Sequence, residues 1–194
     1  MNTSTKTELR AQFRQSWRWL QPSVWEDGAE AVRERLRSHP AWREARSVLL
    51  FAPRVDEPNI WPMVREALDL GKEVGLPAYD PIAEVYGARR LVDPTRDVVT
   101  GAYGIREPGR TCPVLPLAGL DLVLVPGLAF TSAGGRLGRG GGFYDRLLAA
   151  TPAVRMGIGL DEQVVAWLPL EPHDQLLDYV LTPSATHTGR GRPT

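Results

Sequence analysis

Residues 134–145, which read GGRLGRGGGFYD, carry the clearest chemical pattern in this sequence. Residues 127–142 contain seven glycines together with Arg136 and Arg139. Glycines allow backbone N–H groups to converge on an anion without interference from Cβ atoms. The two arginines add permanently charged, forked donors that suit phosphate oxygens. The segment is therefore typical of a phosphate cradle, and a flexible surface turn is the alternative interpretation.

The spacing of the segment excludes two common nucleotide-binding motifs. A Walker A loop needs Lys followed by Ser or Thr after its glycines, and neither pair occurs here. The dinucleotide fingerprint G-x-G-x-x-G is also absent, because Phe143 stands where its third glycine would be. Asp145 lies just beyond the glycines. It can hold a Mg²⁺ ion that bridges phosphates, or it can complement the positive end of a following helix.

The elements expected around the segment form an α/β pattern. Residues 121–126 predict a buried strand and residues 143–150 a helix, so the cradle follows the carboxyl end of a strand, where open α/β sheets bind ligands. Residues 78–112 are expected to be irregular, and a stretch of this length is either functional or carries short strands without a visible pattern. The other expected strands are 47–52, 73–77, 154–160 and 178–181, and the other helices are 6–20, 22–38 and 59–70. This alternation indicates a mostly parallel sheet.

The first expected helix carries a basic stripe beside an apolar one. Its cations recur at four-residue spacing, at Lys6, Arg10, Arg14 and Arg18. Such a stripe is either a solvated helix face or a set of cations that reaches a phosphate, and the residue types alone do not decide between them.

Composition bounds the remaining possibilities. The 194 residues are 43% apolar and 24% charged, which is ordinary globular composition. We expect one domain over residues 1–194, with residues 183–194 as a flexible tail that lacks large apolar side chains. The 23 basic residues balance 23 acidic ones, so nucleic acid and membranes are not expected partners.

Cys112 is the single cysteine, so no intrachain disulfide can form. The sequence shows no signal peptide and no apolar run of about 18 residues, so we expect a cytoplasmic protein.

The central motif extends on both sides of the glycines. It comprises Val125-Pro126-Gly127-Leu128-Ala129-Phe130 and Gly135-x-Leu137-Gly138-x-Gly140-x-Gly142-x-Tyr144-Asp145. Weaker blocks follow in order at Lys6-x-x-Leu9-Arg10, Gly104-Ile105-x-Glu107-Pro108, Leu168-Pro169 and His173-Asp174. Together these residues resemble the signature of the 5-formyltetrahydrofolate cyclo-ligase family, from Lys6 to about residue 182.

The resemblance implies a three-layer α/β/α fold with a mostly parallel sheet, usually monomeric. It also implies ATP- and Mg²⁺-dependent conversion of 5-formyltetrahydrofolate to 5,10-methenyltetrahydrofolate, with release of ADP and phosphate. In that reaction the formyl oxygen is phosphorylated, and the implied catalytic cations are Arg136, Arg139 and Lys6.

Each ligand is assigned a set of residues by the same resemblance. The implied ATP contacts are Lys6, Thr7, Glu8, Leu9, Arg10, Arg136, Leu137, Gly138, Arg139, Gly140, Gly141, Gly142, Phe143 and Tyr144. The implied folate contacts are Arg10, Ala52, Glu57, Arg139, Gly140, Gly141, Gly142 and Phe143. The implied magnesium ligands are Asp145 and Asp174.

Glu57 follows an expected strand, so it can accept hydrogen bonds from the ring N–H groups of a pterin or remain a solvated loop residue. Trp61 and Tyr79 can stack on a pterin or pack in the core. We also expect the glycine-rich loop to be exposed, so that Arg136→Ala leaves the fold intact.

Several positions depart from the family pattern. Pro58-Asn59-Ile60 stands where Val-Asp-Thr is common, Thr131 replaces a frequent aspartate, and Phe143 replaces a frequent tyrosine. These departures leave two alternatives open. One is a paralogue that acts on a different formyl or carboxamide compound, and the other is a non-catalytic protein that binds folate or nucleotide.

Overall fold

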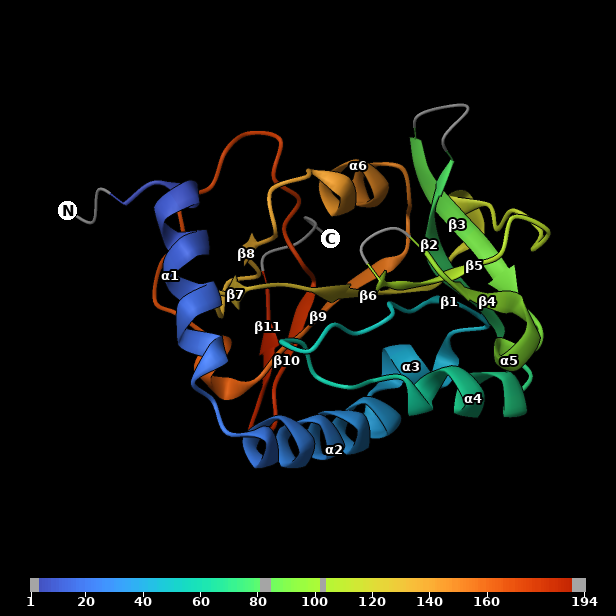
Figure 1. Cartoon of the computed structure of the whole chain (residues 1–194), viewed down its shortest axis with the longest axis horizontal. Coiled ribbons are helices and arrows are strands. Elements are labelled where there is room, and N and C mark those ends of the chain that lie inside the picture. The colour runs from blue at the N-terminus through green and yellow to red at the C-terminus, as the bar shows by residue number, and fades with distance from the viewer. Residues whose placement is uncertain (1–3, 81–84, 102–103, 190–194) are drawn as a thin grey trace.

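The structure is a computed structural model that describes residues 4–80, 85–101 and 104–189 (Figure 1). Its α-helices are α1 (Lys6–Arg18), α2 (Pro22–Ser38), α3 (Pro40–Glu44), α4 (Pro62–Asp69), α5 (Pro94–Asp97) and α6 (Phe143–Ala149). Short 3-10 helices lie at η2 (Leu117–Gly119) and η3 (Asp161–Gln163). Its strands are β1 (Ser47–Leu49), β2 (Glu73–Asp80), β3 (Val85–Leu91), β4 (Val98–Thr100), β5 (Arg106–Pro108), β6 (Leu122–Pro126), β7 (Ala129–Phe130), β8 (Arg136–Leu137), β9 (Val154–Ile158), β10 (Tyr179–Leu181) and β11 (Thr186–Thr188).

The strands of the central sheet follow the order β11-β10-β9-β6-β1-β2-β3. The inner strands β10, β9, β6, β1 and β2 run parallel, and β3 and β11 pair antiparallel at the two edges. β1 and β6 are neighbours in register, with Val48 opposite Leu122. From β1 the chain continues to β2 on one side, whereas from β6 it continues to β9 on the other. The order of the strands therefore reverses between β1 and β6.

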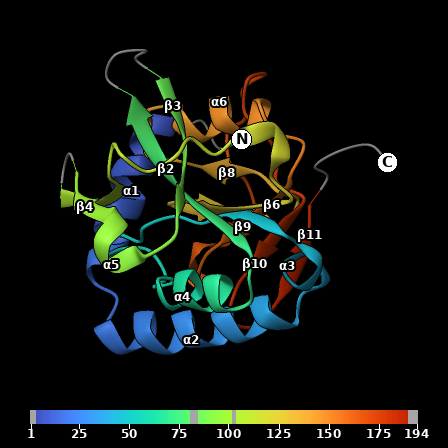
Figure 2. The ribbon, with the colours of Figure 1, turned by 90° about the vertical axis from the view of Figure 1, so that its right-hand side faces the viewer.

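Helices cover both faces of this sheet. α2, α3 and α4 lie along one face and α6 lies on the other, while α1 stands beside β7 and β8 (Figures 1 and 2). Side chains of β6 alternate between the two layers: Leu122 and Leu124 join the core under α2–α4, and Val123 and Val125 join the core under α6. The continuous apolar run of β6 results from this burial on both faces. The predicted three-layer α/β fold is confirmed.

Local sequence signals explain where α1 begins and which side of it is buried. Thr5 caps α1 with its hydroxyl, and the Glu8 side chain accepts a hydrogen bond from the Thr5 backbone N–H, which completes a capping box. α1 then buries Leu9 against Ala129 and Leu137 of the β7–β8 hairpin. This contact holds the basic stripe of α1 beside the glycine-rich segment.

Two sequence predictions about secondary structure are wrong. Residues 78–112 were expected to be irregular, but they contain the end of β2, then β3, α5, β4 and β5. The segment expected to be a tail includes β11, which pairs with β10 through Val180 and His187. Both β3 and β11 are edge strands that expose part of their side chains, so neither needs the apolar runs by which strands are recognised.

Two further observations concern membrane-spanning helices and the single cysteine. Within the described residues, no helix combines the length and the hydropathy needed to cross a membrane. Cys112 is a free, buried thiol that donates a hydrogen bond to the Asp97 carbonyl oxygen. Burial, together with the charge of Asp97, raises the pKa of this thiol, so Cys112 is an inert packing residue.

Candidate active site

The candidate site lies at the carboxyl ends of β1 and β6, where the order of the strands reverses. Ligands bind at this position in open α/β sheets, because diverging loops leave a crevice there. The loop after β1 carries Asp56 and Glu57, and the loop after β6 leads to the β7–β8 hairpin and the glycine-rich segment. Side chains from these two loops meet at Arg139.

The backbone carbonyls of residues 138–142 are held by cations. Arginine side chains donate hydrogen bonds to three of these oxygens: Arg10 to Gly138 at 2.9 Å, Arg14 to Arg139 at 3.1 Å and Arg146 to Gly141 at 3.1 Å. In contrast, the hydrogen bonds of the described residues include none donated by a backbone N–H of residues 138–142. The unpaired N–H groups are donors that an anion can use.

Glycine is required at two positions of this segment. Gly140 has φ +108°, and Gly142, which caps the N-terminus of α6, has φ +61°. Residues other than glycine rarely adopt these backbone conformations without strain. The sequence prediction of a backbone cradle that depends on glycine therefore has a direct conformational basis.

Arg136 is a buried cation, which corrects the expectation that it is exposed. It lies in β8 with 5% of its side chain exposed, because the hairpin folds back beneath the cradle. Its guanidinium donates to both carboxylate oxygens of Asp145 at 3.1 and 3.2 Å and more weakly to the Pro126 carbonyl. Its Nε is buried and has no hydrogen-bond partner. The ring of Tyr144 lies 5.4 Å from the guanidinium carbon.

Arg139 joins the two loops of the site. Its Nε and one terminal nitrogen donate to Glu57 Oε1 at 3.1 and 3.0 Å, and the same terminal nitrogen donates to Asp56 Oδ1 at 2.6 Å. Burial raises the pKa of Glu57, although the charge of Arg139 opposes this shift. The structure thus places Glu57 beside the glycine-rich segment, where its carboxylate pairs with Arg139.

Lys6 forms the third cationic contact of the site, at the first turn of α1. Its ammonium donates to the two oxygens of Asp174 at 2.6 and 2.8 Å and to Glu171 at 2.9 Å. Burial opposes the charge of Lys6, but the hydrogen bonds to Asp174 and Glu171 outweigh it, so the pKa of Lys6 is raised. Lys6 therefore remains a permanent cation in the working pH range.

The two predicted metal ligands come from neighbouring segments. The backbone N–H of Gln175 donates to Asp145 Oδ1 at 3.4 Å, which brings the residue after Asp174 against Asp145. Asp174 also groups with Glu171 and His173, whose ligand atoms all lie within 4.8 Å of one another. Carboxylate oxygens are the donors that Mg²⁺ prefers. The donor set fits magnesium, and each predicted ligand also pairs with a cation, Asp145 with Arg136 and Asp174 with Lys6.

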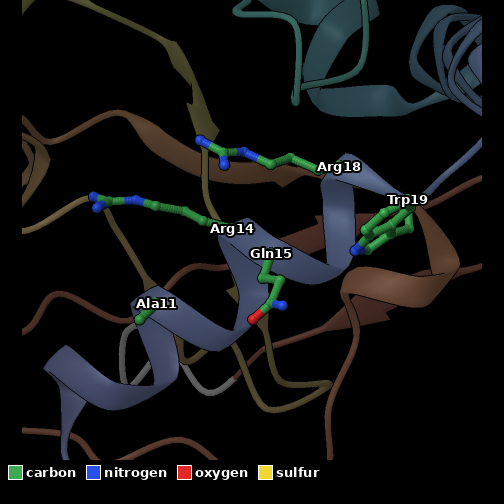
Figure 3. A pocket seen from close by; sticks show the side chains of 5 residues that line it. All are labelled: Ala11, Arg14, Gln15, Arg18 and Trp19. Carbon is green, nitrogen blue, oxygen red and sulfur yellow. The ribbon is translucent and has the colours of Figure 1, made fainter.

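The basic stripe of α1 is divided between two environments. Lys6, Arg10 and Arg14 bond to the acidic segment or to the cradle. Figure 3 shows Arg18 further along the helix beside an open hollow of about 530 Å³, which is lined by Ala11, Arg14, Gln15, Arg18 and Trp19. The interpretation of the stripe as a solvated face is therefore wrong for Lys6 and Arg10, which are partly buried, whereas Arg14 and Arg18 are exposed.

Some predicted site residues have other contacts in the structure. Thr7 and Glu8 are exposed, Glu8 completes the capping box, and Leu9 and Leu137 are buried in the small core beneath the cradle. Ala52 follows β1 and is half-buried.

The predicted aromatic residues pack against neighbouring side chains. Phe143 contacts Tyr86 and Tyr144, Tyr79 contacts Tyr86, and Trp61 lies under Arg106 with 4.0 Å between the guanidinium carbon and the ring. Asp56, Glu171 and Arg146 also contact predicted site residues and were not themselves predicted from the sequence. The only available signal was their position beside residues that the sequence analysis did select.

The mostly parallel sheet defines an α/β protein, and its reversal point carries a glycine-rich segment and clustered cations, groups of a kind that can bind an anion. The chain belongs to the 5-formyltetrahydrofolate cyclo-ligase family, whose sequence model matches residues 2–183. This is an enzyme family, and its name describes a ring-closing ligase.

Proteins with this family name are similar to the chain over nearly its whole length. The chain is 34% identical to a 5-formyltetrahydrofolate cyclo-ligase of Mycolicibacterium smegmatis, covering 94% of this chain and 96% of that protein. It is 33% identical to the Escherichia coli protein of the same name, covering 89% and 97%. The solved structure of Aquifex aeolicus 5,10-methenyltetrahydrofolate synthetase superposes with a TM-score of 0.86 at 29% identity, covering 97% and 95%. A Mycoplasma pneumoniae 5,10-methenyltetrahydrofolate synthetase, 18% identical with a TM-score of 0.73, shares the fold.

Proposed function

We propose that this protein converts 5-formyltetrahydrofolate to 5,10-methenyltetrahydrofolate, with ATP as co-substrate and ADP and phosphate as products. The observation that carries the proposal is the cradle of residues 138–142: arginines bond to three of its carbonyls, and its N–H groups have no partner among the described residues. Membership of the cyclo-ligase family supports the choice of a folate substrate and of a ring-closing reaction.

The reaction needs an activated oxygen, because a formyl amide is a poor electrophile and its oxygen leaves poorly. Transfer of the γ-phosphoryl group of ATP to the formyl oxygen converts that oxygen into a phosphate leaving group. N10 of the folate then attacks the formyl carbon and loses its proton, and phosphate departs as the 5,10 bridge closes. Phosphoryl transfer of this kind depends on alignment and charge neutralisation more than on covalent help from the protein.

The cations of the site provide that neutralisation. In this proposal the N–H groups of residues 138–142 bind the triphosphate, and Lys6, Arg136 and Arg139 stabilise the charge that develops on the transferred phosphoryl group. Arg10 positions the cradle through Gly138. No nucleophilic side chain is required, which agrees with the inert environment of Cys112.

Asp145 and Asp174 would hold Mg²⁺, which would supply charge neutralisation at the phosphates. In the structure these carboxylates neutralise Arg136 and Lys6 instead. When MgATP binds, Arg136 and Lys6 would therefore exchange their carboxylate partners for phosphate oxygens. This exchange keeps the buried cations paired before and after the nucleotide binds.

On the folate side, we propose that Arg10, Ala52, Glu57 and residues 139–143 contact the substrate. Pro58-Asn59-Ile60 lies directly after Glu57, so its departure from the family pattern bears on this half of the site. We also propose that the protein is a cytoplasmic monomer of one domain. The zero net charge gives no reason to expect a nucleic-acid partner.

A coupled assay tests the proposal. Purified protein is incubated with MgATP and 5-formyltetrahydrofolate while the near-ultraviolet absorbance of the methenyl product and the release of ADP are followed together. We expect product and ADP in a one-to-one ratio. ADP without methenyl product, or neither signal when ATP binds, would contradict the proposed reaction.

Two arginines of the same helix provide a matched pair for this assay. Arg10→Gln removes the hydrogen bond to Gly138, so the KM for ATP is expected to rise at least tenfold. Arg18→Gln, two turns further along α1 beside the open hollow, is expected to keep both rates within about twofold. Equal losses in the two variants would show that general positive charge, rather than the cradle, supports activity.

A further inference from the structure

Arg139 divides its hydrogen-bond donors between two neighbouring carboxylates. Its Nε and one terminal nitrogen donate to Glu57 Oε1, and the same terminal nitrogen donates to Asp56 Oδ1 at 2.6 Å. A guanidinium has five N–H donors, so these three contacts leave the pair on the second terminal nitrogen. That pair has no acceptor among the hydrogen bonds of the described residues. It is the part of Arg139 that can meet a phosphoryl oxygen.

Glu57 Oε1 has no room for a substrate donor while it holds Arg139. It accepts both hydrogen bonds from Arg139, and Oε2 accepts one from the backbone N–H of Arg54. A carboxylate oxygen has about two lone-pair sites, so Oε1 is filled. An N–H donor of the folate that reaches this oxygen therefore replaces a bond to Arg139. Contact between Glu57 and the folate loosens the guanidinium.

Asp56 is placed to keep Arg139 paired at that moment. It precedes Glu57 in the same loop, and its bond to Arg139 is the shortest of the three. Burial opposes the charge of Arg139, but the hydrogen bond to Asp56 and the charge of Glu57 outweigh it, so the pKa of Arg139 is raised. The Arg139 side chain is only 26% exposed, and a cation in such a place is costly without an anionic partner.

We infer that Asp56 is a positioning residue for phosphoryl transfer: it keeps Arg139 directed at the transferred group while Glu57 contacts the folate. Asp56 touches neither substrate and acts through Arg139 alone. It thereby links the folate half of the site to the nucleotide half. This inference rests on the proposed function for the roles of Arg139 and Glu57.

Steady-state kinetics separate the two carboxylates. Asp56→Ala leaves Arg139 free to turn away from the phosphoryl group. The kcat is therefore expected to fall about tenfold to hundredfold, with the KM for 5-formyltetrahydrofolate within about twofold of the wild type. Glu57→Gln is expected to raise that KM about tenfold or more, because it changes a folate contact.

Two further variants complete the kinetic design. Asp56→Asn keeps an oxygen acceptor without the charge, so it should recover part of the kcat that Asp56→Ala loses. Asp27→Ala is the control, because Asp27 is an exposed residue of α2 whose side chain makes no hydrogen bond to the described residues. It should leave kcat and KM unchanged.

A binding measurement without turnover tests the same role. Affinities for MgADP and for the magnesium complex of β,γ-imido-ATP are measured by calorimetry, and their ratio reports the contacts of the γ-phosphate. The wild type is expected to bind the imido analogue about tenfold or more tightly than MgADP. Arg139→Gln and Asp56→Ala should each lower this ratio about fivefold or more. The double variant should lower it no further than Arg139→Gln alone, because Asp56 acts through Arg139.

Several results would overturn the inference. One is a wild-type kcat and a wild-type ratio in folded Asp56→Ala. Another is a raised KM for the folate with unchanged kcat in the same variant, which would place Asp56 on the substrate. Losses that add in the double variant, or a wild type that binds the two nucleotides equally, would also overturn it. Thermal unfolding establishes that each variant is folded, and Asp56→Asn carries the test if Asp56→Ala is not.

These outcomes distinguish the inference from the proposed function. A wild type that prefers the imido analogue but makes no methenyl product would contradict the proposed function. Loss of that preference in Asp56→Ala would still identify Asp56 as the residue that orients Arg139. Methenyl product formed by Asp56→Ala at the wild-type rate would leave the proposed function standing and remove the role of Asp56.

Discussion

Lys6 and Asp174 are 168 positions apart in the sequence and are joined by two hydrogen bonds of 2.6 and 2.8 Å. The pair ties the first turn of α1 to the loop that precedes β10. Both side chains are largely buried, with 13% and 12% exposed, so the bond is shielded from solvent and salt. In the proposed reaction this contact is broken, because phosphate takes the place of Asp174 beside Lys6.

The contact between Lys6 and Asp174 is expected to contribute to folding without any ligand. A double-mutant cycle with Lys6→Met and Asp174→Asn should give a coupling free energy of about 1–3 kcal/mol, measured by urea unfolding. The reason is that Lys6→Met leaves the shielded charge of Asp174 without this cation, and Asp174→Asn leaves Lys6 with the more exposed Glu171 as its anionic partner. Additive losses, with no coupling, would show that the pair does not hold α1 in place.

Arg136→Ala is expected to destabilise the fold rather than to affect nucleotide use alone. Removal of the guanidinium leaves Asp145 without its partner and opens a space beneath the cradle, so the free energy of unfolding should fall by about 3 kcal/mol or more. Arg136→Lys keeps the charge but loses the fork, and should lose less.

The control for Arg136 is Arg146→Ala, which changes an exposed residue of α6 whose side chain makes one hydrogen bond to the described residues, to the Gly141 carbonyl. Its free energy of unfolding should change by less than about 1 kcal/mol. Equal unfolding midpoints for Arg136→Ala and the wild type would contradict the buried position of Arg136.

Substitution of two neighbouring glycines distinguishes backbone strain from the steric effect of an added methyl group. Gly140→Ala places a side chain at φ +108°, so it should cost about 1–3 kcal/mol of stability. Gly141→Ala introduces a methyl group into open space at an ordinary φ, and its stability should change by less than about 0.5 kcal/mol. Thermal unfolding of both variants measures the difference. Similar losses for the two variants would contradict the conformation given for the cradle.

Asp97 provides a test of pH dependence remote from the site. Its Oδ2 accepts the backbone N–H groups of Asp93 and Val92 at 2.8 Å, and these bonds lower its pKa, with burial opposing them. A lowered carboxyl pKa contributes stability that is present above the unfolded pKa and is lost as pH falls through the folded pKa. The stability difference between wild type and Asp97→Asn should therefore be largest near pH 7 and shrink below about pH 4.

Urea unfolding at a series of pH values measures this difference for Asp97. A difference that stays constant from neutral pH into acid would show that the ionised carboxylate is not what stabilises the turn.

Local patterns predicted the central elements of the fold. The run Leu-Val-Leu-Val in β6 and the amphipathic spacing of α1 are properties of neighbouring residues, so the sequence displays them directly. β3 and β11 were missed for the opposite reason. An edge strand is stabilised by its partner strand, β2 or β10, and its own residues need not form an apolar pattern.

The candidate site divides in the same way. The glycine-rich segment and its arginines are contiguous, and the sequence predicted them as a cradle. The partners of those arginines are not contiguous: Asp56 lies 83 positions from Arg139, and no periodicity connects the two. The burial of Arg136 was mispredicted because a loop rich in glycine suggests exposure, whereas the short pairing of β7 with β8 folds this residue inward.

The fate of the formyl oxygen tests the central claim most directly. The protein is supplied with MgATP and 5-formyltetrahydrofolate labelled with ¹⁸O in the formyl group, and the released phosphate is analysed by mass spectrometry. We expect one ¹⁸O atom in each phosphate formed, because the phosphorylated formyl oxygen leaves with it. Methenyl product accompanied by unlabelled phosphate would contradict the account, since ATP would then have been hydrolysed by water without activating the formyl group.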